Sequence, residues 1–237
     1  MEADKSLAPL EDAATVVLLR DGAAGLEALM LERPANSSAF AGAWVFPGGK
    51  VDPEDRIGPD GAELTDAQAA HAAGLREVAE ETGLALVPEG LVELSLWTPM
   101  QRLPRRFRTW FLIAAAPGRE VMLNPGEHEN YAWLAPAEAL QRHGAGSLSL
   151  APPTWVTLHH LGESGTAAEA LSRAAADTPF AYESHLVRND AADSAPGAPA
   201  GIMWRGDAEY PGAVLAGGRH RLTMTALPWV FEFTQGN

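Results

Sequence analysis

Three glutamates near the end of a predicted helix have the spacing best suited to chemistry. At 100° per residue, Glu77, Glu80 and Glu81 fall within one arc of about 100°. The helix dipole disfavours each carboxylate in the last turns by about 0.3–1 kcal/mol. A bound cation would offset that cost, and converging carboxylate oxygens suit Mg²⁺ or Mn²⁺. The alternative is a solvated acidic helix face.

Local signals define the helix that carries these glutamates. Thr65 and Asp66 are both candidate N-caps, and Gln68 stands three residues after Thr65, as in a capping box. Gly83 is suited to end the helix in a left-handed conformation. Small and apolar residues lie roughly opposite the glutamates and provide a face that can pack: Ala72, Leu75, Val78 and Ala79.

A glycine turn precedes this helix, in the segment Phe46–Asp52 (FPGGKVD). The turn and the helix together resemble the Nudix box of the Nudix hydrolases, G-x5-E-x7-R-E-U-x-E-E-x-G-U, where U is a bulky apolar residue. Arg76–Leu84 matches the second half of the pattern, and Gly49 matches its first glycine. Asp55, six residues after Gly49 and preceded by Glu54, stands where the box has its first Glu. Between Asp55 and Arg76 lie 20 residues instead of seven, so the box carries a 13-residue insertion.

The resemblance implies an α/β fold, a Nudix-like α/β/α sandwich with a mixed β-sheet. It also implies a metal-dependent hydrolase that uses Mg²⁺ or Mn²⁺ to cleave the diphosphate linkage of a nucleoside-diphosphate-X compound. The metal ligands it implies are Glu77, Glu80, Glu81 and the Gly49 carbonyl. Arg76 would orient these carboxylates. One of Glu77, Glu81 or Glu127 would deprotonate the attacking water, and the family assigns that base differently among its branches.

Glu127 lies in a Pro-Gly loop six residues before Trp133. In many Nudix sequences a glutamate placed in this way helps to bind metal or acts as the base. The alternative is an exposed loop carboxylate.

Clustered arginines are candidates for substrate binding, because guanidinium groups match phosphate oxygens bidentately. Three of them follow Trp97-Thr98-Pro99 closely, and a fourth precedes Pro34. The predicted substrate-binding residues are Arg33, Arg105, Arg106 and Arg108. The alternative is a charged edge strand that blunts aggregation.

The substrate is left open by the sequence. Three features resemble the branch that includes coenzyme A diphosphatases: the sequence of Phe46–Pro53, the Trp-Thr-Pro followed by Pro-Arg-Arg-Phe, and the long C-terminal part. Coenzyme A or an acyl-coenzyme A is therefore one candidate, beside ADP-ribose, a nucleotide sugar or a dinucleotide. A non-catalytic Nudix-fold ligand-binding or regulatory module is the alternative of another class. The intact carboxylate set argues against it, because such a module does not need that costly cluster.

Charge and composition limit the partners. The net charge of −14 and pI of about 4.8 argue against nucleic acid and against an anionic membrane surface. A small phosphorylated substrate remains compatible if a metal and local arginines supply positive charge. The chain has no cysteine, no evident signal peptide and no apolar run approaching about 18 residues. We therefore expect a cytoplasmic protein.

We expect a flexible tail at residues 1–12, a Nudix core at 13–145 and a C-terminal helical and β extension packed on the core at 146–237. A substrate lid or an element that forms a homodimer are alternatives for the extension. The expected strands are Ala14–Arg20, Leu26–Glu32, Ala43–Phe46, Leu91–Trp97, Arg106–Ala114, Val121–Leu123, Tyr131–Leu134, Tyr182–Val187, Ile202–Arg205, Arg219–Ala226 and Trp229–Phe233. Further helices are expected at Pro136–His143, Pro152–Leu161 and Thr166–Ala175, and a low-complexity loop at Asn189–Gly201.

Overall fold

A computed structural model describes residues 8–37, 40–100, 103–124, 126–188, 199–214 and 216–236. Its centre is strand β1 (Leu10–Gly22), whose apolar run is buried on both faces. Ala14, Val16 and Leu18 face one hydrophobic cluster, while Val17 and Leu19 face the other. Because side chains alternate along a strand, this one segment contributes to both cores of the sandwich.

The main sheet is mixed, as expected. Its strands run in the order β8-β3-β2-β1-β6-β5-β9, with β4 paired to β1 and β7 paired to β2. The pairing of β1 with β6 is parallel, whereas β1 and β2 form an antiparallel hairpin. The remaining bounds are β2 Gly25–Glu32, β3 Ala43–Val45, β4 Gly48–Lys50, β5 Val92–Thr98, β6 Arg106–Ala115, β7 Asn130–Leu134, β8 Ser149–Leu150 and β9 Phe180–Glu183.

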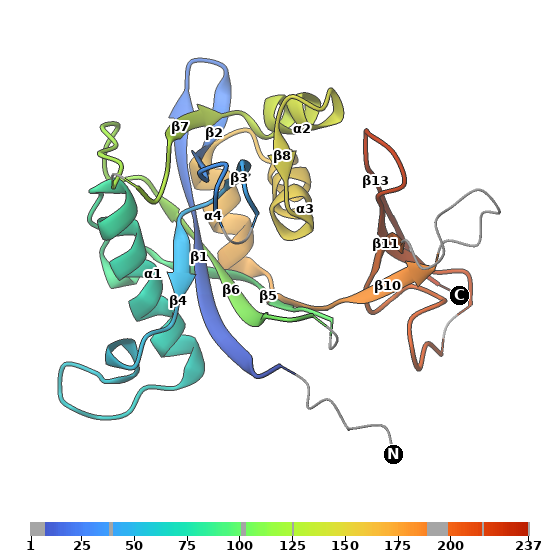
Figure 1. Ribbon diagram of the computed structural model, residues 1–237, viewed down its shortest axis with the longest axis horizontal. Coiled ribbons are helices and arrows are strands. Elements are labelled where there is room, and N and C mark those ends of the chain that lie inside the picture. Colours follow the sequence, from blue (N-terminus) through green and yellow to red (C-terminus); the bar gives the residue numbers. More distant parts are fainter. Residues whose placement is uncertain are drawn as a thin grey trace.

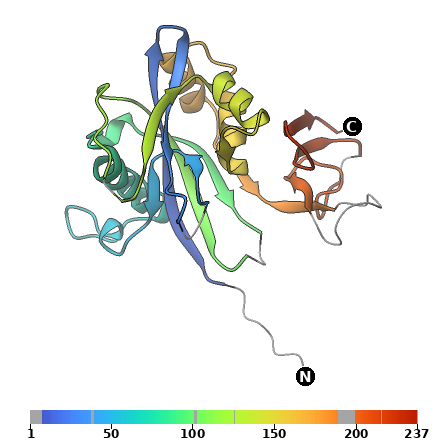
Figure 2. The same cartoon turned by 45° about the horizontal axis from the view of Figure 1, so that its top comes forward.

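Helices cover both faces of this sheet (Figures 1 and 2). Helix α1 (Asp66–Thr82) packs on one face through Ala70, Ala73 and Val78. The opposite face is covered by α2 (Pro136–Gly144), α3 (Pro152–Leu161) and α4 (Ala167–Ala176). The predicted α/β/α sandwich is therefore confirmed. Two short 3₁₀ turns, η1 (Glu54–Arg56) and η2 (Pro88–Gly90), flank α1.

The predicted ends of α1 are confirmed in detail. Thr65 is the N-cap, and its side chain and that of Gln68 form the reciprocal bonds of a capping box. Gly83 follows the helix with φ +69°. In the middle, Gly74 allows close approach to the sheet, because a Cβ there would lie 2.9 Å from Val16 Cγ2.

The predicted strand Tyr182–Val187 is divided at Ser184. β9 joins the main sheet in parallel with β5, while β10 (His185–Arg188) starts a separate antiparallel sheet. That sheet runs in the order β10-β11-β12-β13, and its other members are β11 Pro199–Met203, β12 Arg219–Thr223 and β13 Val230–Thr234. An aromatic contact joins the two sheets: Trp97 stacks on Tyr182 with centroids 3.9 Å apart, and Trp204 meets both rings edge-on.

Several expected boundaries differ from the structure. β1 already starts at Leu10, so the last residues of the expected 1–12 tail are strand, and residues 1–7 lie outside the described part. Val121–Leu123 is not a strand, because Met122 N–H bonds the carbonyl of Thr82 at the end of α1 instead of a neighbouring strand. The expected Asn189–Gly201 loop lies outside the described residues up to 198, and its last three residues belong to β11.

The position of the extension also changes. β8, α3, α4 and β9 all lie beyond residue 145, yet they complete the main sheet and its second helical layer. We therefore infer that the chain passes from the main sheet to the second sheet at Ser184, while the division into a core at 13–145 and an extension at 146–237 stays a prediction. Among the described residues, no helix is both long and apolar enough to cross a membrane.

Candidate active site

The glycine turn of the sequence forms the short strand β4, which pairs antiparallel with β1 beside α1. Gly48 has φ +155°, and a Cβ there would lie 2.3 Å from the carbonyl oxygen of Ala14. At Gly49 a Cβ would lie 2.2 Å from Oε1 of Glu77. The absence of side chains at these two positions therefore lets the strand approach β1 and lets the Glu77 carboxylate lie against β4.

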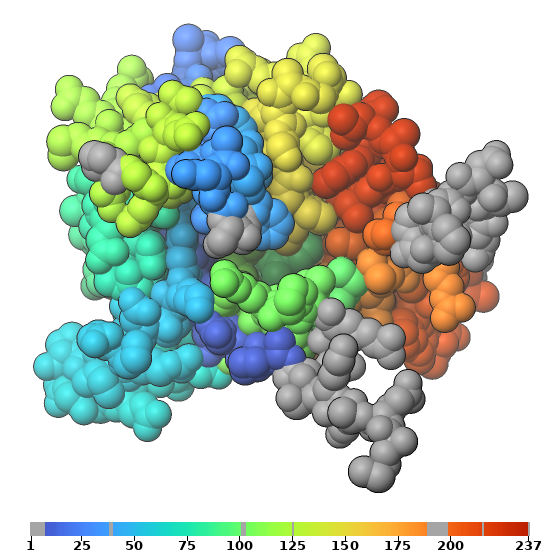
Figure 3. Space-filling model, in the orientation of Figure 1, coloured from blue at the N-terminus to red at the C-terminus, as the bar shows by residue number. Residues whose placement is uncertain are grey.

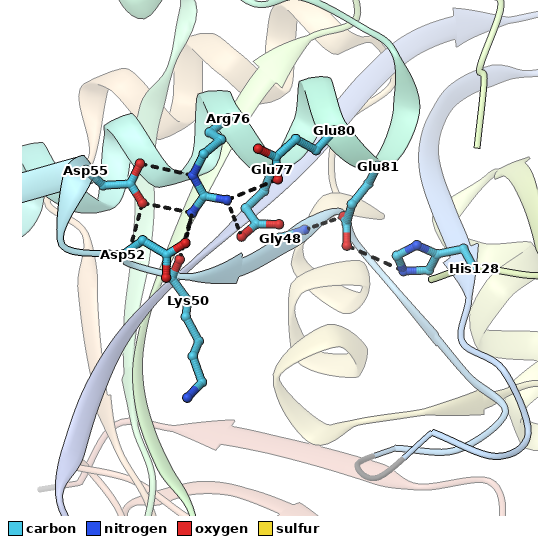
Figure 4. Close-up of polar contacts among 9 residues, drawn as sticks. All are labelled: Gly48, Lys50, Asp52, Asp55, Arg76, Glu77, Glu80, Glu81 and His128. Atoms are coloured by element: carbon cyan, nitrogen blue, oxygen red, sulfur yellow. Dashed lines mark hydrogen bonds and ion pairs between the residues drawn. The ribbon is translucent and has the colours of Figure 1, made fainter. Parts of the chain in front are cut away.

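Arg76 links the two halves of the predicted motif (Figure 4). Its Nε and Nη2 donate to the two oxygens of Asp55 at 3.1 and 2.8 Å, and Nη2 also donates to the Lys50 carbonyl at 3.0 Å. Its Nη1 donates to Glu77 at 2.9 Å and to Glu80 at 3.2 Å. Asp55, 7% exposed, thus fixes the arginine that orients the glutamates, although the insertion separates them in sequence.

The insertion itself is an ordered loop. Ile57 and Glu63 form an antiparallel bridge, and Leu64 N–H donates to the Arg56 carbonyl at 2.8 Å. Arg56 also donates to Asp12 of β1 at 2.6 Å and to Asp66 of α1 at 3.1 Å. Hydrogen bonds therefore join the two ends of the inserted loop before α1 begins.

Glu81 is the most deeply buried of the three helix glutamates. One oxygen accepts a 2.8 Å hydrogen bond from the Gly48 N–H, and the side chain is 6% exposed. Burial raises the pKa of Glu81 to about 8, and the nearby charges of Glu77 and Glu127 act in the same direction. Burial likewise raises the pKa of Glu77, while hydrogen bonding from Arg76 opposes the rise. Such a cluster is costly when ionised unless a cation neutralises it.

The loop before β7 brings further groups to Glu81. Asn124 N–H bonds the Glu81 carbonyl at 3.2 Å, and Glu129 N–H bonds the Glu32 carbonyl at 2.9 Å. The loop is thus fixed to both α1 and β2. One ligand atom each from Glu81, Glu127 and His128 lies within 4.8 Å of the other two.

His128 is not among the site residues predicted from the sequence, although it is adjacent to Glu127. Its side chain is 2% exposed, and its Nε2 lies 3.7 Å from Glu81 Oε1. Burial lowers the pKa of His128 to about 4, with a smaller contribution from Arg33. In the sequence, the histidines do not have the spacing of a metal-binding motif. The one feature that could have indicated a metal-binding role for His128 is its position between Glu127 and Glu129.

The predicted arginines do not form one cluster. Arg108 donates to Asp12 at 2.9 Å and to Asp66 at 2.6 Å, and stacks on Trp110, so carboxylates already occupy its guanidinium. Arg106 bonds the Ala8 carbonyl, and Arg105 is exposed. Arg33 is close enough to lower the pKa of both Glu81 and His128 through its charge.

These groups fit a divalent cation. The donor set is carboxylate oxygen and imidazole nitrogen, and His128 leaves both ring nitrogens without a hydrogen-bond partner among the described residues. A separate cavity of about 300 Å³ lies between α3, α4, β5 and β9, and none of these acidic residues lines it. The acidic cluster at the α1–β4 junction is therefore distinct from this cavity.

An α/β/α sandwich in which an arginine is hydrogen-bonded to a glutamate cluster on one helix is the arrangement that the resemblance to the Nudix hydrolases predicts. The NUDIX domain matches residues 9–152, more than half of the chain, and the chain belongs to the Nudix hydrolase family. A NUDIX hydrolase from Alicyclobacillus acidocaldarius is 25% identical, with a TM-score of 0.62, over 70% of this chain and 97% of that one.

Two other solved structures are more distant. A MutT NUDIX hydrolase from Burkholderia pseudomallei is 23% identical, with a TM-score of 0.47, over 64% of this chain and 97% of that one. The NUDIX domain of Shewanella oneidensis NrtR, in complex with ADP ribose, is 20% identical, with a TM-score of 0.48, over 68% of this chain and 91% of that one. Neither similarity bears on the substrate of this chain.

Proposed function

We propose that this chain is a metal-dependent hydrolase that cleaves the diphosphate linkage of a nucleoside-diphosphate-linked compound, with coenzyme A or an acyl-coenzyme A as the first candidate. The observation that supports it is the convergence of Glu77, Glu81 and Glu127, whose charges act on one another beside a glycine strand. A non-catalytic module would keep this repulsion without using it.

The proposed ligands of Mg²⁺ or Mn²⁺ are Glu77, Glu80, Glu81 and the Gly49 carbonyl, with Glu127 from the loop. When bound, the cation neutralises the diphosphate and polarises the attacking water. Glu77, Glu81 or Glu127 accepts the proton of that water. Arg76 holds Glu77 and Glu80 in place, and Asp55 holds Arg76.

The proposed substrate site lies next to β4. Figure 3 shows a hollow between the segment before β3 (blue), α3 (yellow) and the β5–β6 hairpin (green), with β4 (light blue) at its border. In the sequence, Arg33 belongs to the segment between β2 and β3, while Arg105 and Arg106 belong to the β5–β6 hairpin. These three arginines remain the proposed phosphate contacts. Arg108 has no support for that role, because Asp12 and Asp66 hold it.

A substrate panel tests the reaction. Coenzyme A, acetyl-coenzyme A, ADP-ribose, NADH, nucleotide sugars and nucleoside triphosphates would be incubated with Mg²⁺ or Mn²⁺, and the phosphorylated products quantified. We expect cleavage of a diphosphate bond into two phosphorylated products. Preferential cleavage of ADP-ribose or a nucleotide sugar would replace coenzyme A as substrate. Tight ligand binding without turnover would support the module, and a flat response would contradict the hydrolase.

The panel needs matched variants. Glu81→Gln and Glu80→Gln should each lower metal-dependent turnover, by about 100-fold for the buried Glu81. Glu89→Gln changes an exposed glutamate in η2 and should leave turnover unchanged. Near wild-type turnover in Glu81→Gln would show that the ligand assignment is wrong.

A further inference from the structure

His128 is a buried histidine whose two ring nitrogens have no hydrogen-bond partner among the described residues. The other two buried histidines differ in this respect. His143 Nδ1 lies 3.1 Å from the Leu148 carbonyl oxygen, and His220 Nδ1 lies 2.8 Å from that of Arg205. Buried polar groups are normally paired, so an imidazole without any partner calls for an explanation.

The surroundings of His128 provide one. Its Nε2 stands 3.7 Å from Glu81 Oε1, which is too long for a hydrogen bond. Two ligand atoms about 2.1 Å from one ion stand roughly 3.0 Å apart at a right angle and about 4.2 Å apart when opposite. The observed spacing lies within that range. Glu127 offers a third ligand atom within 4.8 Å of both.

The backbone holds this arrangement from two sides. The loop is bonded to the end of α1 at Asn124 and to β2 at Glu129, on either side of His128. In Figure 4 the ring points toward the Glu81 carboxylate, on the side of Glu81 away from Arg76. The imidazole is therefore placed at the glutamates and is not part of an apolar core.

We propose that His128 is a metal ligand, so that Glu81, Glu127 and His128 form a mixed nitrogen–oxygen position that favours Mn²⁺ and later transition ions over Mg²⁺. The inference rests on the proposed function in that the same glutamates bind the catalytic cation. Mg²⁺ prefers oxygen ligands and keeps its waters, whereas imidazole suits transition ions. The nitrogen ligand would therefore set which cation the enzyme uses.

The test measures the metal directly. Metal-free protein would be loaded with Mn²⁺ alone, and electron spin-echo spectroscopy would detect coupling to an imidazole ¹⁴N. We expect the coupling in the wild type and in His71→Asn, and its loss in His128→Asn. His71 is a matched control because it lies on α1, but faces Glu93. Absence of coupling in the wild type, or its persistence in His128→Asn, would overturn the assignment.

Affinity gives a second readout. His128→Asn should bind Mn²⁺ at least about tenfold more weakly, while Mg²⁺ affinity, from competition, stays within about twofold. Equal weakening for both ions would overturn the selectivity. Thermal unfolding without metal should match the wild type, which excludes misfolding as the cause.

Turnover on the same samples separates this inference from the proposed function. Coupling without hydrolysis of any panel compound would leave the ligand assignment standing and refute the reaction. Hydrolysis without coupling would refute the assignment of His128 as a ligand and leave the proposed reaction standing.

Discussion

Replacing Gly49 with alanine should inactivate the protein without unfolding it. A Cβ at this position would lie 2.2 Å from Glu77 Oε1 and 2.4 Å from Glu77 Cδ. A normal contact needs about 3.4 Å, so the carboxylate must move by roughly 1 Å or more. Because the obstructed atoms are the end of a flexible side chain, the strand can remain in place while the glutamate is displaced.

The expected magnitude follows from that displacement. A misplacement of about 1 Å in a catalytic group can cost about 100-fold in rate, or about 2.7 kcal/mol in transition-state stabilisation. Stability should change by less than about 1 kcal/mol, because alanine replaces glycine in a strand without a left-handed backbone requirement. Mn²⁺ affinity should fall together with turnover.

Two other glycines supply the comparison. Gly90→Ala introduces a Cβ with its nearest contact at 3.6 Å, from Val87, and should behave as the wild type. Gly48→Ala meets backbone atoms of Ala14 and Thr15 at 2.3 and 2.8 Å, so it should lower the melting temperature itself. The assay is kcat/KM on the best panel compound, with Mn²⁺ titration and thermal unfolding. Full activity in Gly49→Ala, or a loss of stability equal to that of Gly48→Ala, would refute the reasoning.

Two further predictions concern ion pairs. Asp55→Asn should weaken the two hydrogen bonds from Arg76, which lowers the free energy of unfolding by about 1–3 kcal/mol and reduces turnover. Asp55→Glu keeps the charge and should retain more of both the stability and the turnover. Urea unfolding measures the stability, and the panel assay measures the turnover. Burial opposes ionisation of Asp207, but hydrogen bonds from Arg221 and two backbone N–H groups outweigh it and lower its pKa to about 2 from 3.8. This stabilisation, about 2 kcal/mol, is present above pH 3.8 and is lost as the pH falls through 2. The difference in urea-unfolding free energy between the wild type and Asp207→Asn should therefore shrink between pH 3.8 and 2. A difference that stays constant over this window would contradict the prediction.

Features set by local sequence could be predicted, because their determinants lie within a few residues. The capping box at Thr65, the left-handed Gly83 and the Arg76–Glu80 contact are all of this kind. The break at Ser184 has no such signal. Tyr182 before it and Leu186 and Val187 after it all favour a strand, and the polar Glu183-Ser184-His185 between them does not say that β9 pairs with β5 while β10 pairs with β11.

Longer-range pairing explains the other differences. Val121–Leu123 has the composition of a strand, but the end of α1 takes its Met122 backbone bond. His128 could not be assigned because its meeting with Glu81 depends on how the loop is bonded to α1 and β2. The deep burial of Asp55, and hence its hold on Arg76, depends on how the insertion folds back on itself.

The arginines show how this affects the interpretation of substrate binding. Arg106 and Arg108 are close in the sequence, yet the parallel register of β1 and β6 places Asp12 directly beside Arg108. The same aspartate accepts from Arg56, so Arg108 helps to close the insertion. Arg33 comes from a different part of the chain, and its charge reaches both Glu81 and His128. A cation at that position can face the phosphate that the glutamates repel, which makes Arg33 a stronger candidate for substrate contact than the arginines clustered in sequence.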